Sequence, residues 1–401
     1  MIVTKRKINS LILFFFLMIC IFFPGDPYHI KLVLLFALIV LNCKVIVKKI
    51  GCSQYRPVLL GGMLFPIVIM LQSFALTGNL GASISGGYSP TILLLLIPIV
   101  EDDLNYKKQV LFLLKSMAIS VLLIATADLV GLYDVNGHDF IRNAFYDYGM
   151  GVMGKSPAYS SYYRIFYKAS PLLVLLLDDS ISKQDYKWVA ISFGALWFTG
   201  TRANVFSASI IFFFRYVVWS NNKKPARYLI AFLIVFAVSI SFPRVYNMIV
   251  GMMNTSGAKS SDSVRSGEVL AYAEVFSDPV KLLFGSGFGE PFFNYGRGSI
   301  EYTSELSYFE MIRCVGLIFA IPFFAFVFRP ILSKKVNRDY SLSYICYLLI
   351  AATNPLLFSS TAFLIYMFMY YDIVKSPNSG KLPFGENVDS QKNVVPKERS
   401  Y

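Results

Sequence analysis

Apolar blocks separated by short polar segments recur through almost the whole 401-residue chain. Each block is about 15 to 23 residues long, close to the length at which a helix crosses about 30 Å of hydrocarbon. Hydrophobic residues make up 56% of the chain and charged residues only 15%, whereas about a quarter of the residues in a soluble domain are charged. These features exclude an ordinary soluble globular fold and predict an all-α, polytopic membrane helix bundle.

The blocks predict about twelve transmembrane helices packed as one domain. The expected spans lie near residues 8–23, 30–47, 57–77, 88–100, 110–131, 162–177, 186–198, 203–219, 226–242, 307–328, 340–352 and 355–371. The first follows a basic cluster as a signal peptide does, but no small-residue cleavage site comes after it, so we expect it to remain. Residues 1–372 are expected to form the transmembrane domain, and the polar residues 373–401 a disordered cytoplasmic tail.

The distribution of basic residues predicts the orientation of the bundle. With this arrangement of spans the Lys and Arg clusters fall on one face, and the short opposite loops at 24–29 and 79–87 contain neither residue. Both termini are therefore expected in the cytoplasm. Two long loops, about 132–161 and 243–306, fall on the outer face, and long loops in a compact bundle are usually functional. The second loop contains a segment with helical spacing at 266–276.

Several classes of function lack the residues that they need. The net charge of +13 comes from short clusters between apolar blocks, with no basic stripe or zinc knuckle, so we expect no nucleic-acid partner. Five cysteines without a C-x-x-C pair and only two histidines indicate neither a disulfide framework nor a metal site. The Walker A, G-x-S-x-G and H-E-x-x-H patterns are absent, so nucleotide-driven, serine-dependent and zinc-dependent hydrolysis are not expected.

Arginines on the outer face are the strongest remaining feature, because the orientation rule does not require them there. The guanidinium group is well suited to bidentate capture of phosphate oxygens. Each arginine alone is equally compatible with a solvated side chain or a contact with lipid headgroups. The residues concerned are Arg142, Arg164, Arg202, Arg244, Arg265 and Arg297.

Two of these arginines have informative neighbours. Thr199-Gly200-Thr201-Arg202 forms a very short reversal between two spans and holds Arg202 at the outer membrane edge, where it binds a lipid-linked diphosphate or simply anchors the bundle. In the second loop, Asp262 or Ser263 is expected to cap a helix with Arg265 and Glu268 in its first turn. That helix start either faces an anion or is an ordinary capped surface helix.

The chain resembles the family of O-antigen polymerases and O-antigen ligases over residues 199–328 in local detail, and over its whole length in topology. The motifs that carry the resemblance are Thr199-Gly200-Thr201-Arg202, Ser263-Val264-Arg265, the segment 278–289 and the segment 305–310, followed by Gly316. The resemblance implies a multi-pass protein of the bacterial inner membrane. It also implies an enzyme that joins undecaprenyl diphosphate-linked oligosaccharide repeat units on the periplasmic face during lipopolysaccharide synthesis, without metal or nucleotide, and with a polysaccharide chain-length regulator as a possible partner.

Departures from the family pattern favour a polymerase over a ligase. Ligases usually carry His-Asn where this chain has Glu305-Leu306, and that histidine is thought to act on the acceptor hydroxyl. The paired Arg-x10-Gly elements of some polymerases are also missing, because Arg142 is followed by Gly154 one residue too late. We therefore expect Glu305 to fill the role of the missing histidine, unless it only caps the helix that follows.

The chemistry of such a transfer is simple in outline. The diphosphate is a good leaving group once cations stabilise its developing charge, and a base must take the proton of the incoming hydroxyl. Glu305, Arg265 and Arg202 are the expected catalytic residues. The expected substrate-binding residues are Arg142, Arg164, Asp262, Glu268, Arg297, Tyr308 and Glu310. Tyrosine belts at the membrane interface are the alternative explanation for Tyr308.

The alternative from another class is a flippase or transporter of lipid-linked oligosaccharides, which would also be polytopic. A transporter is expected to carry ionisable residues in mid-span. The plausible ones here, Asp128, Lys168 and Arg313, can all be placed near the outer edge. The long second outer loop also favours an enzyme. A ligase, or a polymerase of another glycan on the same lipid, remains the nearest alternative within the enzyme class.

Overall fold

The computed structural model describes residues 4–26, 28–130, 139–156, 159–218, 256–333, 336 and 338–375. The expected span at 226–242, Arg244 and the tail beyond residue 375 lie outside the described residues. The described chain is mostly helical. The helix α19 ends at Lys375, three residues beyond the expected boundary at 372.

Helices form most of the predicted spans. In the first half of the chain they are α1 (Lys5–Phe22), α2 (Ile30–Leu41), α3 (Cys43–Lys48), α4 (Arg56–Leu59), α5 (Phe65–Thr77), α6 (Leu80–Gly87), α7 (Leu96–Glu101), α8 (Tyr106–Leu129) and α9 (Asp139–Asp147). They continue with α10 (Leu173–Ser182), α11 (Tyr186–Phe198), α12 (Arg202–Phe213), α15 (Ser256–Phe276), α16 (Pro279–Phe284), α17 (Ser307–Leu332), α18 (Ser341–Ala351) and α19 (Ser360–Lys375). The short turns are η1 (Ser53–Tyr55), η2 (Leu60–Leu64), η3 (Ser89–Leu95), η4 (Ser170–Leu172), η5 (Phe214–Val218) and η6 (Arg338–Tyr340), of which η2 and η5 are π-helical.

Three described helical stretches are long and apolar enough to cross a membrane: Ser53–Thr77, Tyr106–Asp128 and Ser307–Leu332. A fourth results if Leu80–Gly87 and Ser89–Glu101, which meet at a bend of 42°, form one broken span. The structure therefore supports a helical membrane protein. The expected count of about twelve spans is not confirmed, because other apolar helices, such as α2 with 12 residues, are shorter.

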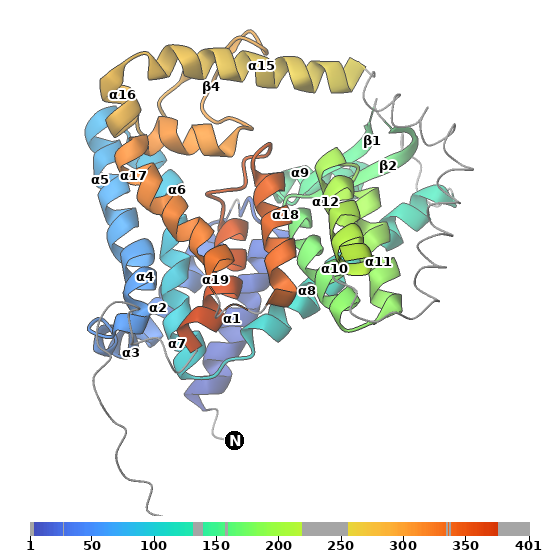
Figure 1. Ribbon diagram of the computed structural model, residues 1–401, viewed down its shortest axis with the longest axis horizontal. Helices are drawn as coiled ribbons and strands as arrows, with labels where there is room; N and C mark the ends of the chain where they lie inside the picture. The colour runs from blue at the N-terminus through green and yellow to red at the C-terminus, as the bar shows by residue number, and fades with distance from the viewer. Residues whose placement is uncertain are drawn as a thin grey trace, which may run out of the picture.

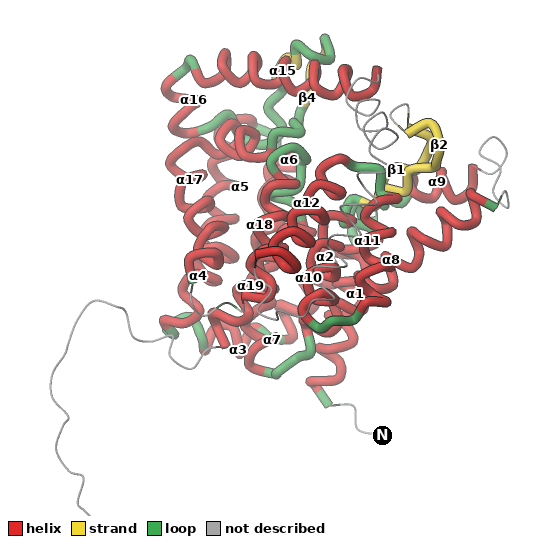
Figure 2. The backbone as a smooth tube through the Cα atoms, turned by 45° about the vertical axis from the view of Figure 1, so that its right-hand side comes forward, coloured by secondary structure: helices red, strands yellow, loops and turns green. Residues whose placement is uncertain are grey.

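Two antiparallel hairpins depart from the purely helical prediction. One pairs β1 (Gly151–Ser156) with β2 (Tyr159–Tyr167), and the other pairs β3 (Phe292–Asn294) with β4 (Ser299–Glu301). Figure 2 shows both toward the end of the bundle that α15 covers. The predicted span at 162–177 is consequently wrong in its first half. Ile165 and Tyr167 face the core at alternate positions, as in a half-buried strand, and α10 begins only at Leu173.

The helix α19 lies in the middle of the bundle and nearly all its residues are buried, as expected of a helix that is apolar on every side (Figure 1). At the end opposite α15, where the N-terminus lies, basic side chains pair with carboxylates. Lys107 contacts Asp372 at 2.6 Å, and Lys49 contacts Glu101 at 2.7 Å. These pairs tie helices that are distant in sequence to one another at the edge of the apolar core.

A break in α17 connects the bundle to the segments outside it. Gly316 has φ 76° and ψ 167°, so the helix is interrupted there. The carbonyl groups of Arg313 and Cys314 accept hydrogen bonds from the backbone N–H groups of Ser286, at 2.7 Å, and Gly287, at 2.9 Å. A Cβ atom at Gly316 would lie 2.3 Å from the Leu283 carbonyl oxygen, so only glycine permits this approach.

Arg313 supports the same junction with its side chain. Its guanidinium is 1% exposed and contacts both carboxylate oxygens of Glu310, each at 2.8 Å. It also donates to the carbonyl oxygens of Glu290, at 2.9 Å, and Tyr302, at 3.2 Å. Arg313 thereby ties residues 290–302 to the N-terminal part of α17.

We predict that Arg313→Ala lowers the free energy of unfolding by about 3 to 5 kcal/mol, because removing one partner of a buried ion pair leaves the other charge uncompensated. Thermal unfolding in detergent measures this change, and limited proteolysis should show earlier cleavage in residues 290–302. The control is Lys44→Ala, which replaces an exposed residue on α3 and should change the free energy of unfolding by less than about 0.5 kcal/mol. Equal stability of the two variants would contradict the anchoring role.

Candidate functional site

The helices α15 and α16 and the β3–β4 hairpin form a layer across the end of the bundle where α17 begins (Figure 1). We call these elements the outer layer. The backbones of α15 and of the turn between β3 and β4 meet at two glycines. A Cβ atom at Gly267 would lie 1.8 Å from the nitrogen of Gly296, so no other residue fits at Gly267. This contact brings Arg265, on α15, close to Arg297, which follows Gly296.

Four charged side chains meet beside this contact, and we call them the outer cluster. A carboxylate oxygen of Glu305 lies 3.2 Å from Arg265, and the other lies 3.4 Å from Arg297. Arg297 also contacts Glu301 at 3.5 Å. The side chains of Arg265 and Glu305 are 27% and 31% exposed, so they are accessible without being fully solvated. The structure thus brings together three predicted site residues, Arg265, Arg297 and Glu305.

Glu268 lies directly beneath the outer cluster and is 1% exposed. Its carboxylate accepts hydrogen bonds from the Ser304 hydroxyl at 2.8 Å, the Asn294 amide at 3.3 Å and the Glu305 backbone N–H at 3.3 Å. Burial raises the pKa of Glu268, and the hydrogen bonds from Ser304 and the Glu305 backbone oppose that rise. Glu268 therefore holds the backbone of Glu305 in place, and its expected role in substrate binding stays a prediction.

Other predicted site residues have structural contacts. Glu310 is paired with Arg313 and accepts a hydrogen bond from the Tyr272 hydroxyl at 3.0 Å. The Tyr308 hydroxyl donates to the Leu348 carbonyl at 3.2 Å, so this side chain packs toward α18. These contacts direct neither Glu310 nor Tyr308 into the outer cluster.

The predicted helix start at Asp262 or Ser263 is wrong. The helix α15 begins at Ser256, so Arg265 and Glu268 lie well inside it, away from the unpaired N–H groups of its first turn. The side chain of Asp262 lies outside the described residues. The expectation that Glu305 caps α17 is also not met, because the capping residue is Leu306 and no side chain caps this end.

A second group of predicted arginines lies at the turn between α11 and α12. Gly200 has φ 64°, and the aliphatic part of Arg164, from β2, packs directly against it. Arg202 is exposed as the first residue of α12. The Asn204 amide donates to the Thr199 hydroxyl at 2.9 Å and stabilises the turn. Arg142 is exposed on α9.

An outer cleft of about 360 Å³ lies between α15, α16 and β3. Its lining combines apolar and charged side chains, among them Glu274, Asp278, Lys281 and Phe293. The Tyr295 hydroxyl, next to the cleft, donates to Glu274 at 2.6 Å, and this contact raises the pKa of the tyrosine. These cleft residues were not among the predicted site residues, although Glu274, Asp278 and Lys281 recur at intervals of three or four residues.

Lys31 was also not among the predicted site residues. It is 4% exposed near the outer end of α2, and its ammonium group donates to the Pro24 carbonyl at 2.9 Å and the Ser360 hydroxyl at 3.3 Å. A lysine inside an apolar block, just after an outer loop without basic residues, is the signal that could have identified it. It joins α2 to α19.

Comparison with known proteins gives no relative: no family model, no curated protein and no solved structure matches this chain. Within the described residues, no group of three or more His, Cys, Asp or Glu side chains is arranged to hold a metal ion.

We predict that Glu268→Gln changes the pH dependence of stability. The raised pKa means that the folded state binds the proton more tightly than the unfolded state does. This group therefore contributes its full stabilisation below the pKa of the unfolded state, about 4.3, and the contribution is lost as pH rises through the pKa of the folded state. The Gln variant cannot ionise. Its unfolding temperature relative to the wild type should therefore increase between about pH 4 and pH 7. Glu274→Gln, on the exposed side of the same helix, is the matched control, and a pH-independent difference for Glu268→Gln would contradict the prediction.

Proposed function

We propose that this protein is a glycosyltransferase of the O-antigen polymerase type, which joins lipid diphosphate-linked oligosaccharide repeat units at the outer face of a bacterial inner membrane. The observation that supports this most directly is the outer cluster, in which Glu305 lies between Arg265 and Arg297 at the end of long apolar helices. Two guanidinium groups and a carboxylate, partly exposed at a membrane edge, are the groups that diphosphate displacement requires.

The orientation of the bundle is part of this proposal. The end where basic residues gather faces the cytoplasm together with both termini, and the outer layer faces the periplasm. The remaining predicted segments complete a bundle of about twelve spans. The lipid tail of the substrate then lies among the spans, and its diphosphate is at the level of the outer layer.

The reaction follows from these positions. The hydroxyl of an acceptor sugar attacks the anomeric carbon of the donor, the new glycosidic C–O bond forms, and the C–O bond to the diphosphate breaks. Arg265 and Arg297 stabilise the charge that develops on the leaving diphosphate. In the resting protein these two arginines hold Glu305, and the incoming diphosphate competes for them. Glu305, released from its ion pairs, accepts the proton of the acceptor hydroxyl.

The outer cleft supplies a place for the acceptor glycan. Carboxylates accept hydrogen bonds from sugar hydroxyls, and exposed aromatic rings such as Phe293 offer a flat apolar surface to a sugar ring. The cleft and the outer cluster share α15, with Glu274 about 13 Å along the helix axis from Arg265. This spacing matches an acceptor chain that extends away from the reacting end.

We predict that cells lacking this protein make lipopolysaccharide with a single repeat unit, because unpolymerised units are still ligated. Gel electrophoresis of lipopolysaccharide reads the outcome. A bare core, as expected after loss of a flippase or ligase, or an unchanged ladder, would contradict the polymerase proposal.

We predict that Glu305→Gln reduces the turnover of purified protein on lipid-linked repeat units by about 10² to 10⁴, the usual contribution of a positioned general base. The matched control is Glu301→Gln, which removes a carboxylate that contacts Arg297 and the Ser299 hydroxyl, and which should retain activity within about tenfold. Binding of the lipid-linked substrate should persist in both variants. Equal loss of activity in the two variants would show that charge balance in the outer cluster, rather than a base at Glu305, is what matters.

A further inference from the structure

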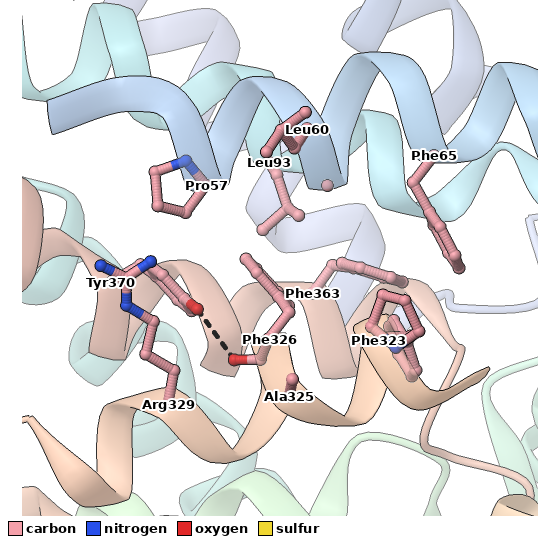
Figure 3. A pocket seen from close by; sticks show the side chains of 12 residues that line it. Pro57, Leu60, Phe65, Leu93, Phe323, Ala325, Phe326, Arg329, Phe363 and Tyr370 are labelled. Atoms are coloured by element: carbon pink, nitrogen blue, oxygen red, sulfur yellow. Dashed lines mark hydrogen bonds between the residues drawn. The ribbon is translucent and has the colours of Figure 1, made fainter. Parts of the chain in front are cut away.

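A groove of about 290 Å³ runs between the helical stretch Ser53–Thr77 on one side and α17 and α19 on the other (Figure 3). Its walls are almost entirely apolar, with Leu60, Phe65 and Phe326 among them. Ser53–Thr77 and α17 are two of the three described stretches that are long and apolar enough to span a membrane. The groove therefore lies at the depth of the hydrocarbon, and Leu60, 57% exposed, opens it toward lipid.

Irregular backbone on both walls explains why the groove stays open. On one wall the helix passes through the π-helical turn Leu60–Leu64, which contains two glycines. On the other wall Pro322 interrupts the hydrogen-bond ladder of α17. The rings of Phe65 and Phe323 stack across the two walls, with 5.6 Å between centroids, and the groove lies beside this contact.

One end of the groove is basic. Figure 3 shows the guanidinium of Arg329 directed toward the end where Pro57 lies, and Arg56 directly precedes Pro57. Both arginines are exposed, and neither forms an ion pair with any described carboxylate. An apolar groove with the exposed Arg329 guanidinium at one end, and with Arg56 next to the lining residue Pro57, is complementary to one ligand chemistry, an acyl chain that ends in a phosphate.

We propose that this groove binds an anionic phospholipid, with one acyl chain along Leu60, Phe65 and Phe326 and the phosphate at Arg329 and Arg56. The site lies at the end of α17 opposite to the outer cluster. Arg329 lies about 20 Å along the helix beyond the break at Gly316, and the outer cluster lies on the other side of that break, so the groove does not place the diphosphate of a lipid-linked substrate near Glu305. The lipid bound here is thus a component of the surrounding membrane, and the inference is independent of the proposed glycosyl transfer.

Native mass spectrometry of the detergent-purified protein tests this proposal, with phosphatidylglycerol and phosphatidylcholine of identical acyl chains added in equal amounts. The wild type should retain phosphatidylglycerol in preference. Arg329→Ala should lower that retention about fivefold, the fold-change for one basic residue near an anionic headgroup. Ala325→Trp fills the groove from an exposed position and should reduce retention of both lipids. Lys108→Ala removes an equally exposed charge outside the groove and should have no effect.

Three results would overturn the proposal. Equal retention of the two lipids by the wild type would remove the role of charge. Unchanged retention in both Arg329→Ala and Ala325→Trp would place the bound lipid elsewhere. Undecaprenyl phosphate displacing phosphatidylglycerol at equal concentration would assign the groove to the substrate lipid instead. None of these measurements depends on turnover, so failure here leaves the proposed function unaffected.

Discussion

Buried backbone polar groups cannot be left without partners, and this constraint organises the end of the molecule that the outer layer covers. The break in α17 at Gly316 frees two carbonyl groups, and the N–H groups of Ser286 and Gly287 occupy them. Arg313 adds two further backbone contacts from the same turn of helix. The outer layer is therefore attached to a rigid span by the hydrogen bonds that the span itself lacks.

The outer cluster depends on that attachment. Residues 290–302, tied down by Arg313, carry Gly296 to the surface of α15, and the contact between Gly296 and Gly267 sets Arg297 next to Arg265. Glu268 then fixes the backbone of Glu305 from below. Each charged group in the cluster is held by neighbours whose own positions are determined by packing, which favours a preorganised site over one assembled on binding.

The sequence predicted the helical class and which charged residues come together, but it was less informative about where individual helices and strands begin. Arg265, Arg297 and Glu305 could be selected because they lie in one predicted loop, and Arg265 and Glu305 also match motif positions. The structure brings the three together. The start of α15 was misplaced because Ser263 is a good capping residue, yet the helix continues through it from Ser256. The strand β2 was read as a span because an alternating aromatic run is as apolar as a helical one. Contacts across glycines have no signature in the order of residues, whereas the pairing of Glu310 with Arg313, three residues apart on one helix, does have one.

The π-helical turn Leu60–Leu64 also fixes the rotational register of its span. A π turn holds one residue more than the α-helical ladder needs, so removing a residue there would restore a regular helix. Everything after it would turn by about 100° and shift by about 1.5 Å. Ser73, whose hydroxyl accepts the N–H of Phe288 at 2.7 Å and which packs beside Gly287, would then face away from the outer layer. The same π-helical turn therefore both borders the groove and orients Ser73, farther along the helix, toward the outer layer.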